Sequence, residues 1–142
     1  MSINKEIPIE LQKKCVNACT DGTLWAAGDN RYGELGIGNT TSHNTFVQVP
    51  ASGPATMARG FYHNLSIDNN GTLSASGDNQ YGQFGTGVNG TSTTFSPVLS
   101  GVAQAACGDG FSSAIKNDGT LWSAGLNDCG ELGLASNNNT NV

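Results

Sequence analysis

The chain has 142 residues, of which 37% are hydrophobic and only 12% are charged, and its formal net charge is −5 at pH 7. This length suits one domain or a short array of repeats. The few basic residues are scattered, apart from Lys13 and Lys14, so the composition argues against binding to nucleic acid and against attraction to an anionic membrane.

The N-terminal stretch MSINKEIPIELQKK contains no apolar run long enough for a signal peptide, and no stretch of the chain is apolar enough to span a membrane. We therefore expect a soluble protein of the cytoplasm or of a virus particle. Residues 7–10 are a weak candidate for a first strand, and IELQKK would form one helical turn at most. Cys15 and Cys19 lie about 13 Å apart on an expected strand, too far for a disulfide, and all the cysteines are expected to be buried free thiols.

One segment then occurs three times, as DGTLWAAGDNRYGELG at 21–36, NGTLSASGDNQYGQFG at 70–85 and DGTLWSAGLNDCGELG at 118–133. From Gly22 to Gly71 is 49 residues, and from Gly71 to Gly119 is 48. A period near 50 is the size of one four-stranded propeller blade. We therefore expect a single repeat domain over 1–142, with repeats at roughly 7–54, 55–102 and 103–142, the last of them incomplete.

Each repeat is predicted to contain a hairpin at its Asp-Gly or Asn-Gly pair, with a type I′ turn that needs positive φ at both central residues. In the middle repeat the strands are expected at 64–68 and 72–76, and further strands at 55–59, 94–99 and 103–107. The abundance of Gly, Ser, Thr and Asn favours strands and turns, and no segment has a convincing helical pattern. The predicted fold class is all-β, with four-stranded antiparallel blades.

The residues that recur in register have roles in building such a blade. Small residues after Leu24, Leu73 and Leu121 let neighbouring sheets approach closely, and glycines allow positive φ or packing without a Cβ. An asparagine just after the strand can hold a turn through its amide. The residues of this repeat signature are Gly22, Gly28, Asn30, Gly33, Gly36, Gly60, His63, Gly71, Gly77, Asn79, Gly82, Gly85, Gly108, Gly119, Gly125, Asn127, Gly130 and Gly133.

This signature resembles the regulator of chromosome condensation repeat family, with the pattern G-x-x-H-S-x-A-L, D-G-x-V-x-x-W-G-x-N, G-Q-L-G. The middle repeat carries it best, at Gly60, His63, Ser66, Ile67, Asn70, Gly71, Gly77, Asn79, Gly82, Gln83, Phe84 and Gly85. The resemblance implies a β-propeller of four-stranded blades.

The sequence also departs from the family pattern. The family usually has seven repeats and this chain has about three. The Trp before the strand-end glycine is replaced by Ala27, Ser76 and Ala124. We do not carry over the exchange activity or the chromatin binding of the best-known member, because no loop here matches its loops residue by residue.

Other candidate sites receive structural interpretations. GELGIG and GQFGTG lack the helix that a phosphate-binding loop needs. His63 is expected to bond to turn backbone, and His43 to be solvated. Asp29 and Asp78 are expected to cap turns, with a weak Ca²⁺ site as the alternative. Trp25 and Trp122 are expected to be buried between blades, and are candidate binding anchors if they are exposed.

We therefore predict a non-enzymatic structural or protein-interaction protein without cofactor or metal, possessing protein partners but no nucleic-acid or membrane partner. Its composition resembles phage virion components such as decoration or tail-associated proteins. The alternatives are a regulatory module that binds a partner on one propeller face, and a carbohydrate-binding protein. Three blades cannot close a ring alone. Self-association is therefore expected, with the segment KEIPIEL completing the last blade of a second chain, or a different protein covering the ends.

Overall fold

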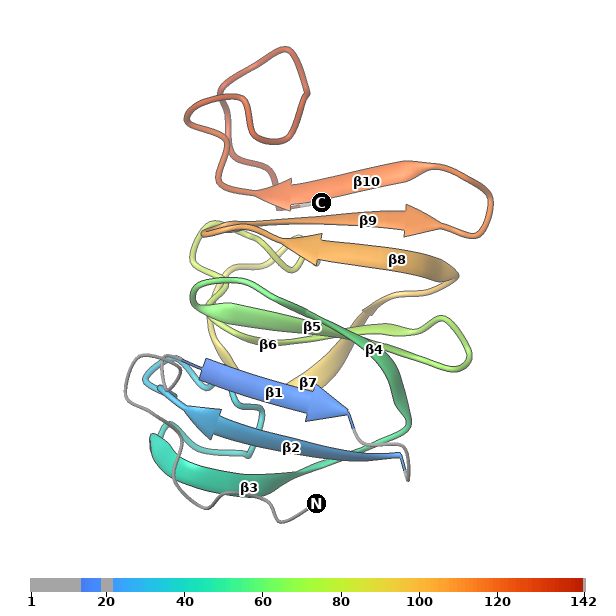
Figure 1. Ribbon diagram of the computed structural model, residues 1–142. Helices are drawn as coiled ribbons and strands as arrows, with labels where there is room; N and C mark the ends of the chain where they lie inside the picture. Colours follow the sequence, from blue (N-terminus) through green and yellow to red (C-terminus); the bar gives the residue numbers. More distant parts are fainter. Residues whose placement is uncertain (1–13, 19–21, 142) are drawn as a thin grey trace.

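The computed structural model describes residues 14–18 and 22–141, and within this range the chain is all-β, without a helix (Figure 1). Ten strands form three antiparallel sheets that follow one another through the molecule in chain order, and we call these sheets blades 1, 2 and 3. Over the described residues the three sheets form an open series and not a closed ring. The predicted fold class is confirmed.

Blade 1 has the strand order β1-β2-β3, with β1 at Lys14–Ala18, β2 at Thr23–Gly28 and β3 at His43–Ser52. Blade 2 has the order β4-β5-β6-β7, with β4 at Pro54–Arg59, β5 at His63–Asp68, β6 at Leu73–Gly77 and β7 at Ser92–Leu99. Blade 3 has the order β10-β9-β8, with β8 at Val102–Cys107, β9 at Phe111–Lys116 and β10 at Leu121–Gly125.

The strands predicted in the middle repeat are confirmed as β4, β5, β6 and β7, and the strand predicted at 103–107 is β8. The repeat places β1, β5 and β9 at equivalent positions, and likewise β2, β6 and β10. The weak strand expected at 7–10 and the helical turn expected at IELQKK lie outside the described residues.

The predicted type I′ hairpin turn is wrong. Between β5 and β6, the Gly71 amide donates to the Asp68 carbonyl at 3.1 Å, and the Asp68 amide donates to the Thr72 carbonyl at 3.1 Å. Gly71 has a φ of +77°, but Ala135 is the only non-glycine with positive φ in the described part of the chain, so Asn70 is not left-handed. This is a three-residue loop, in which a type I turn is followed by a left-handed glycine.

Two apolar clusters fill the spaces between neighbouring blades. The first joins residues of blade 1 to residues of blade 2: Leu24, Ala26, Leu35 and Val49 with Met57 and Phe95. The second joins blade 2 to blade 3: Leu65, Ile67, Leu73 and Ala75 with Val102 and Ala114. Each fully buried Leu or Val contributes about 1.5–3 kcal/mol relative to exposure. Because both clusters lie between sheets, the hydrophobic core of this chain forms where neighbouring blades pack against each other.

Candidate interaction surface

The recurring asparagine after the second hairpin strand fastens a long loop in every blade. The Asn30 side chain accepts from the Leu35 amide at 2.9 Å and donates to the Thr41 carbonyl at 3.1 Å. Asn127 does the same in blade 3, accepting from the Leu132 amide and donating to the carbonyls of Ser136 and Asn138. Asn79 accepts from the Phe84 amide and donates to the Val88 carbonyl. These buried amides fix the loops that leave β2, β6 and β10 on one side of the molecule (Figure 1).

Carboxylates and amides near the same turns add further bonds. The side chains of Glu34, Gln83 and Glu131 accept from the backbone amide two residues before them, at 2.8–3.0 Å. Asp29 accepts from the Arg31 guanidinium at 2.7 Å, and this bond is the main reason that the pKa of Asp29 lies below its usual value. Asp78 accepts from the amide of Gln80 at 3.2 Å. The carboxylates of these residues therefore form hydrogen bonds within their own turns.

The glycines of the repeat signature occupy backbone positions that an L-residue tolerates poorly. Most have positive φ, and Gly77 is also crowded, because a Cβ there would meet the Tyr62 carbonyl. Gly60 and Gly108 lie before β5 and β9, where a Cβ would meet the rings of His63 and Phe111 respectively. The signature glycines with positive φ are Gly22, Gly28, Gly33, Gly36, Gly71, Gly77, Gly82, Gly85, Gly119, Gly125, Gly130 and Gly133.

The two histidines lie apart from each other. His63 is fully buried, and its Nε2 shares a 2.8 Å hydrogen bond with the Ser112 hydroxyl. That bond links blade 2 to blade 3, whereas the sequence suggested a bond to turn backbone. His43 is the first residue of β3, opposite Gly28, and is half-buried; the expectation of a solvated loop residue is wrong there.

The two tryptophans are more exposed than expected. Trp25 is 36% exposed and Trp122 is 48% exposed, so the expected burial between blades is wrong. Each indole N–H donates to the threonine hydroxyl two residues earlier, Thr23 at 2.9 Å and Thr120 at 3.0 Å. The Lys116 ammonium also lies 5.4 Å from the centre of the Trp122 ring. The rings are therefore held in place on the strand surface.

The described residues offer neither a grouped set of metal ligands nor a cluster of cysteines. In the part of the chain that the structure describes, no three His, Cys, Asp or Glu side chains are grouped to hold a metal ion. Cys107 is half-buried, but Cys129 is exposed, contrary to the expectation of burial. No helix long and apolar enough to cross a membrane occurs among residues 14–18 and 22–141.

Four aromatic side chains, which we call the aromatic loop patch, lie on the loops and turns of blades 1 and 2: Tyr32, Phe61, Tyr62 and Tyr81. The ring centres of Tyr32 and Tyr62 are 5.0 Å apart, and those of Phe61 and Tyr62 are 4.6 Å apart. Phe61 is 56% exposed and Tyr81 is 46% exposed.

The backbone of Phe61 and the ring of Tyr81 both lie against the loop that precedes β9. The Phe61 amide donates to the Gly108 carbonyl at 3.4 Å, and the Tyr81 ring lies 3.1 Å from where a Cβ on Gly110 would stand. This patch was not predicted from the sequence. A signal was present, because Tyr32 and Tyr81 are equivalent residues whose counterpart in blade 3 is Cys129, so the blade itself does not need a tyrosine.

A second apolar surface lies on blade 3. Ile115 and Leu121 are opposite each other in the β9–β10 pair and therefore point to the same side of the sheet. Leu121 is 70% exposed and Ile115 is 41% exposed. We call these two residues the blade-3 face.

Known proteins share this architecture. The profile of the regulator of chromosome condensation (RCC1) repeat matches residues 57–83 and 102–131. Similar solved structures include Prp20p of Saccharomyces cerevisiae, described with its binding to Gsp1p and histones, at 17% identity and a TM-score of 0.80. Human WBSCR16 has 20% identity and a TM-score of 0.78, and yeast RCC1 (Prp20) bound to Kap60 has 19% and 0.75.

Each alignment covers 91% of this chain but only 34–36% of the solved chain, so this chain spans about a third of their length. No curated protein sequence matches it significantly. At these identities the structural likeness concerns the fold, and the match of the repeat profile agrees with it. Residues 57–83 and 102–131 therefore match the regulator of chromosome condensation repeat, and the described chain shares the fold of propeller blades with these solved structures.

Proposed function

We propose that this chain is a non-enzymatic protein-interaction module that binds a partner protein through the aromatic loop patch. The observation that carries the proposal is the exposure of Phe61, in the turn between β4 and β5, and of Tyr81, on the loop that the buried Asn79 holds in place. Aromatic side chains are enriched at the centres of protein interfaces because they bury a large area at a low entropic cost.

The similar solved proteins support this class of function. Prp20p binds Gsp1p and histones, and a structure of yeast RCC1 shows it bound to Kap60. For this chain a small GTPase, a histone or a transport receptor is therefore a reasonable first set of partners to test. A net charge of −5 favours a basic partner such as a histone at low salt.

The test is affinity capture with the wild-type chain and with the double variant Phe61→Ala/Tyr81→Ala, followed by direct binding measurements with the captured protein. We expect the double variant to lose binding at least tenfold. Val88→Ala is the matched control, because Val88 is an exposed apolar loop residue outside the patch. Equal binding by all three proteins would place the interface elsewhere and defeat the proposal.

Self-association is the second interaction that we propose, and the blade-3 face supports it, because it is an exposed apolar pair on a sheet surface. A virion role has only composition in its favour. Carbohydrate binding through Trp25 or Trp122 has their exposure in its favour, and a glycan array with Trp25→Ala as the comparison tests it.

A further inference from the structure

The turn between β8 and β9 carries an exposed carboxylate. The turn is tight, because the Gly108 amide donates to the Phe111 carbonyl at 2.8 Å. Asp109 follows Gly108 in this turn and is exposed. Within the described chain no hydrogen bond or ion pair holds its carboxylate, and the only ion pair between described residues joins Arg31 to Asp29. The charge of Asp109 therefore has no partner in the described part of the fold.

Two aromatic residues of blade 2 contact this turn on either side of Asp109. The Phe61 amide donates to the carbonyl of Gly108, the residue before Asp109, at 3.4 Å. The Tyr81 ring lies 3.1 Å from where a Cβ would stand on Gly110, the residue after Asp109. Asp109 is therefore adjacent to both exposed residues of the aromatic loop patch.

The repeat shows that these positions are exposed even where another blade follows. Blade 2 packs against blade 1 and against blade 3, and Phe61 and Tyr81 are nevertheless 56% and 46% exposed. Asp109 is the counterpart of Phe61, since Gly60 and Gly108 occupy equivalent positions just before them. The exposure of Asp109 therefore agrees with that of its counterpart in a blade with neighbours on both sides.

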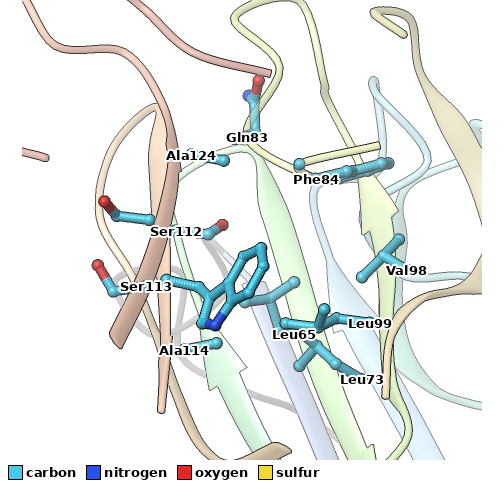
Figure 2. Close-up of a pocket in the computed structure, with 13 residues that line it drawn as sticks. Leu65, Leu73, Gln83, Phe84, Val98, Leu99, Ser112, Ser113, Ala114 and Ala124 are labelled. Atoms are coloured by element: carbon cyan, nitrogen blue, oxygen red, sulfur yellow. The ribbon is translucent and has the colours of Figure 1, made fainter. Parts of the chain in front are cut away.

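The pocket between blades 2 and 3 is a separate feature (Figure 2). It has a volume of about 70 Å³, and its lining includes Leu65, Leu73, Phe84, Leu99 and Ala114. None of the described residues that line it is charged. Because a cation that leaves water needs a paired anion, this pocket does not suit a cationic group, whereas the β8–β9 turn provides a carboxylate.

A carboxylate beside exposed aromatic residues has the chemistry to bind a cationic side chain. The face of an aromatic ring attracts a cation, and a carboxylate forms charge-assisted hydrogen bonds with it. Arginine suits this combination better than lysine, because its planar guanidinium can stack on a ring and donate two hydrogen bonds to one carboxylate. The chain already contains such a pair, since Arg31 binds Asp29 through Nε at 2.9 Å and Nη2 at 2.7 Å.

We propose that Asp109, together with Phe61 and Tyr81, binds an arginine side chain of the partner protein. The guanidinium bonds to the Asp109 carboxylate and stacks on an exposed ring of the aromatic loop patch. The proposal rests on the proposed function, because it assigns the chemistry of the partner at the same patch. The net charge of −5 agrees with it, since a negatively charged protein attracts a basic segment before contact.

The first test follows the signals of the full chain by nuclear magnetic resonance. The probe is the peptide Gly-Ala-Arg-Ala-Gly with blocked ends, and the control peptide has citrulline, which keeps the shape of arginine without its charge. We expect the arginine peptide to shift the signals of the Tyr81 ring and of the Gly108 and Gly110 amides in a saturable way, and the citrulline peptide to bind at least tenfold more weakly. Equal binding of both peptides, or no saturable shift with either, would overturn the proposal.

Two aspartate variants separate a site at Asp109 from the general negative charge of the protein. Asp109→Asn should weaken binding of the arginine peptide at least tenfold and leave the fold intact, since no described residue bonds to this carboxylate. Asp128→Asn is the matched control, because it removes one exposed charge from a loop of the same blade, and it should change binding less than twofold. Equal effects of the two variants would show that long-range attraction holds the peptide, and would also overturn the proposal.

The partner protein captured with the wild-type chain distinguishes this proposal from the proposed function. Asp109→Asn should weaken binding of that partner at least tenfold, and the loss should become smaller at high salt, which screens exposed charges. If Phe61→Ala/Tyr81→Ala abolishes partner binding but Asp109→Asn does not, only the arginine site is wrong. If the arginine peptide binds at Asp109 while the double variant keeps the partner, only the proposed function is wrong.

Discussion

At the scale of single residues, the glycines of the repeat divide into two physical kinds. Gly119 has a φ of +83°, with no atom within 4 Å of where a Cβ would stand. Gly77 has a φ of +104°, and a Cβ there would meet the Tyr62 carbonyl and lie 2.8 Å from the His63 Cα. The first kind serves the turn alone, whereas the second also lets two backbone segments come together.

Alanine substitution should separate these two kinds. Gly119→Ala should cost about 1–2 kcal/mol, the penalty of a left-handed backbone for an L-residue. Gly77→Ala should cost about 3 kcal/mol or more, because backbone atoms must also move. Chemical denaturation of both variants measures the difference, and equal costs would show that the crowding at Gly77 is relieved without strain.

A hairpin aspartate should make stability depend on pH. Asp68 accepts from the Thr72 and Asn70 amides at 2.8 Å each, and these bonds, that of Thr72 foremost, hold the pKa of Asp68 below its usual value of 3.8. Near that pH the unfolded chain takes up more protons than the folded chain. The stabilisation present above about pH 4 is therefore lost as the pH falls through the lower, folded pKa.

We expect the melting temperature of the wild type to fall below about pH 4, and that of Asp68→Asn to fall less, because asparagine keeps an acceptor oxygen without the charge. Asp109→Asn changes an exposed aspartate in a different turn, between β8 and β9, and serves as the control. Parallel curves for the wild type and Asp68→Asn would argue against a role for this carboxylate.

At the scale of one element, the loop after β10 depends on one side chain. Asn127 is fully buried and bonds to Leu132, Ser136 and Asn138, so it ties both ends of the loop to the blade. A buried hydrogen bond contributes about 1 kcal/mol, and more where its loss leaves a buried group unpaired.

Asn127→Ala should therefore destabilise the chain by about 2–4 kcal/mol and speed proteolysis within residues 128–139. Asn138→Ala is the matched control, since Asn138 contributes its backbone carbonyl to this bond and not its side chain. Equal rates of proteolysis in both variants would show that interactions other than the Asn127 side-chain bonds hold the loop.

The hairpins could be predicted from the sequence because their signal is local. Asn70-Gly71 between two short alternating runs is enough to place β5 and β6. The turn type could not be predicted, since it depends on whether one residue or two take positive φ. The exposure of Trp25 and Trp122 was also misjudged, because alternation along a strand does not say how much of each side the next blade covers. The aromatic loop patch was missed since its members come from different blades.

At the scale of the whole molecule, the blade-3 face leads us to expect self-association. Two exposed apolar residues on a sheet surface favour burial against another protein surface. Sedimentation velocity at micromolar concentrations should show self-association that Leu121→Ser weakens and Val88→Ser does not. A monomer at all these concentrations would contradict this part of our proposal. The division into repeats at 7–54, 55–102 and 103–142 stays a prediction.

Among the described residues, the two apolar clusters and the hydrogen bonds between blades join blades that are neighbours in the chain. Asn64 of β5 reaches the Glu34 carbonyl of blade 1 at 2.6 Å, and His63 beside it reaches Ser112 of blade 3. In such a series each unit is stabilised by the units on its two sides. When the described chain is pulled from its two ends, we therefore expect it to unfold in separate steps, one blade at a time. Blade 2 should unfold last, because it packs against a blade on each side.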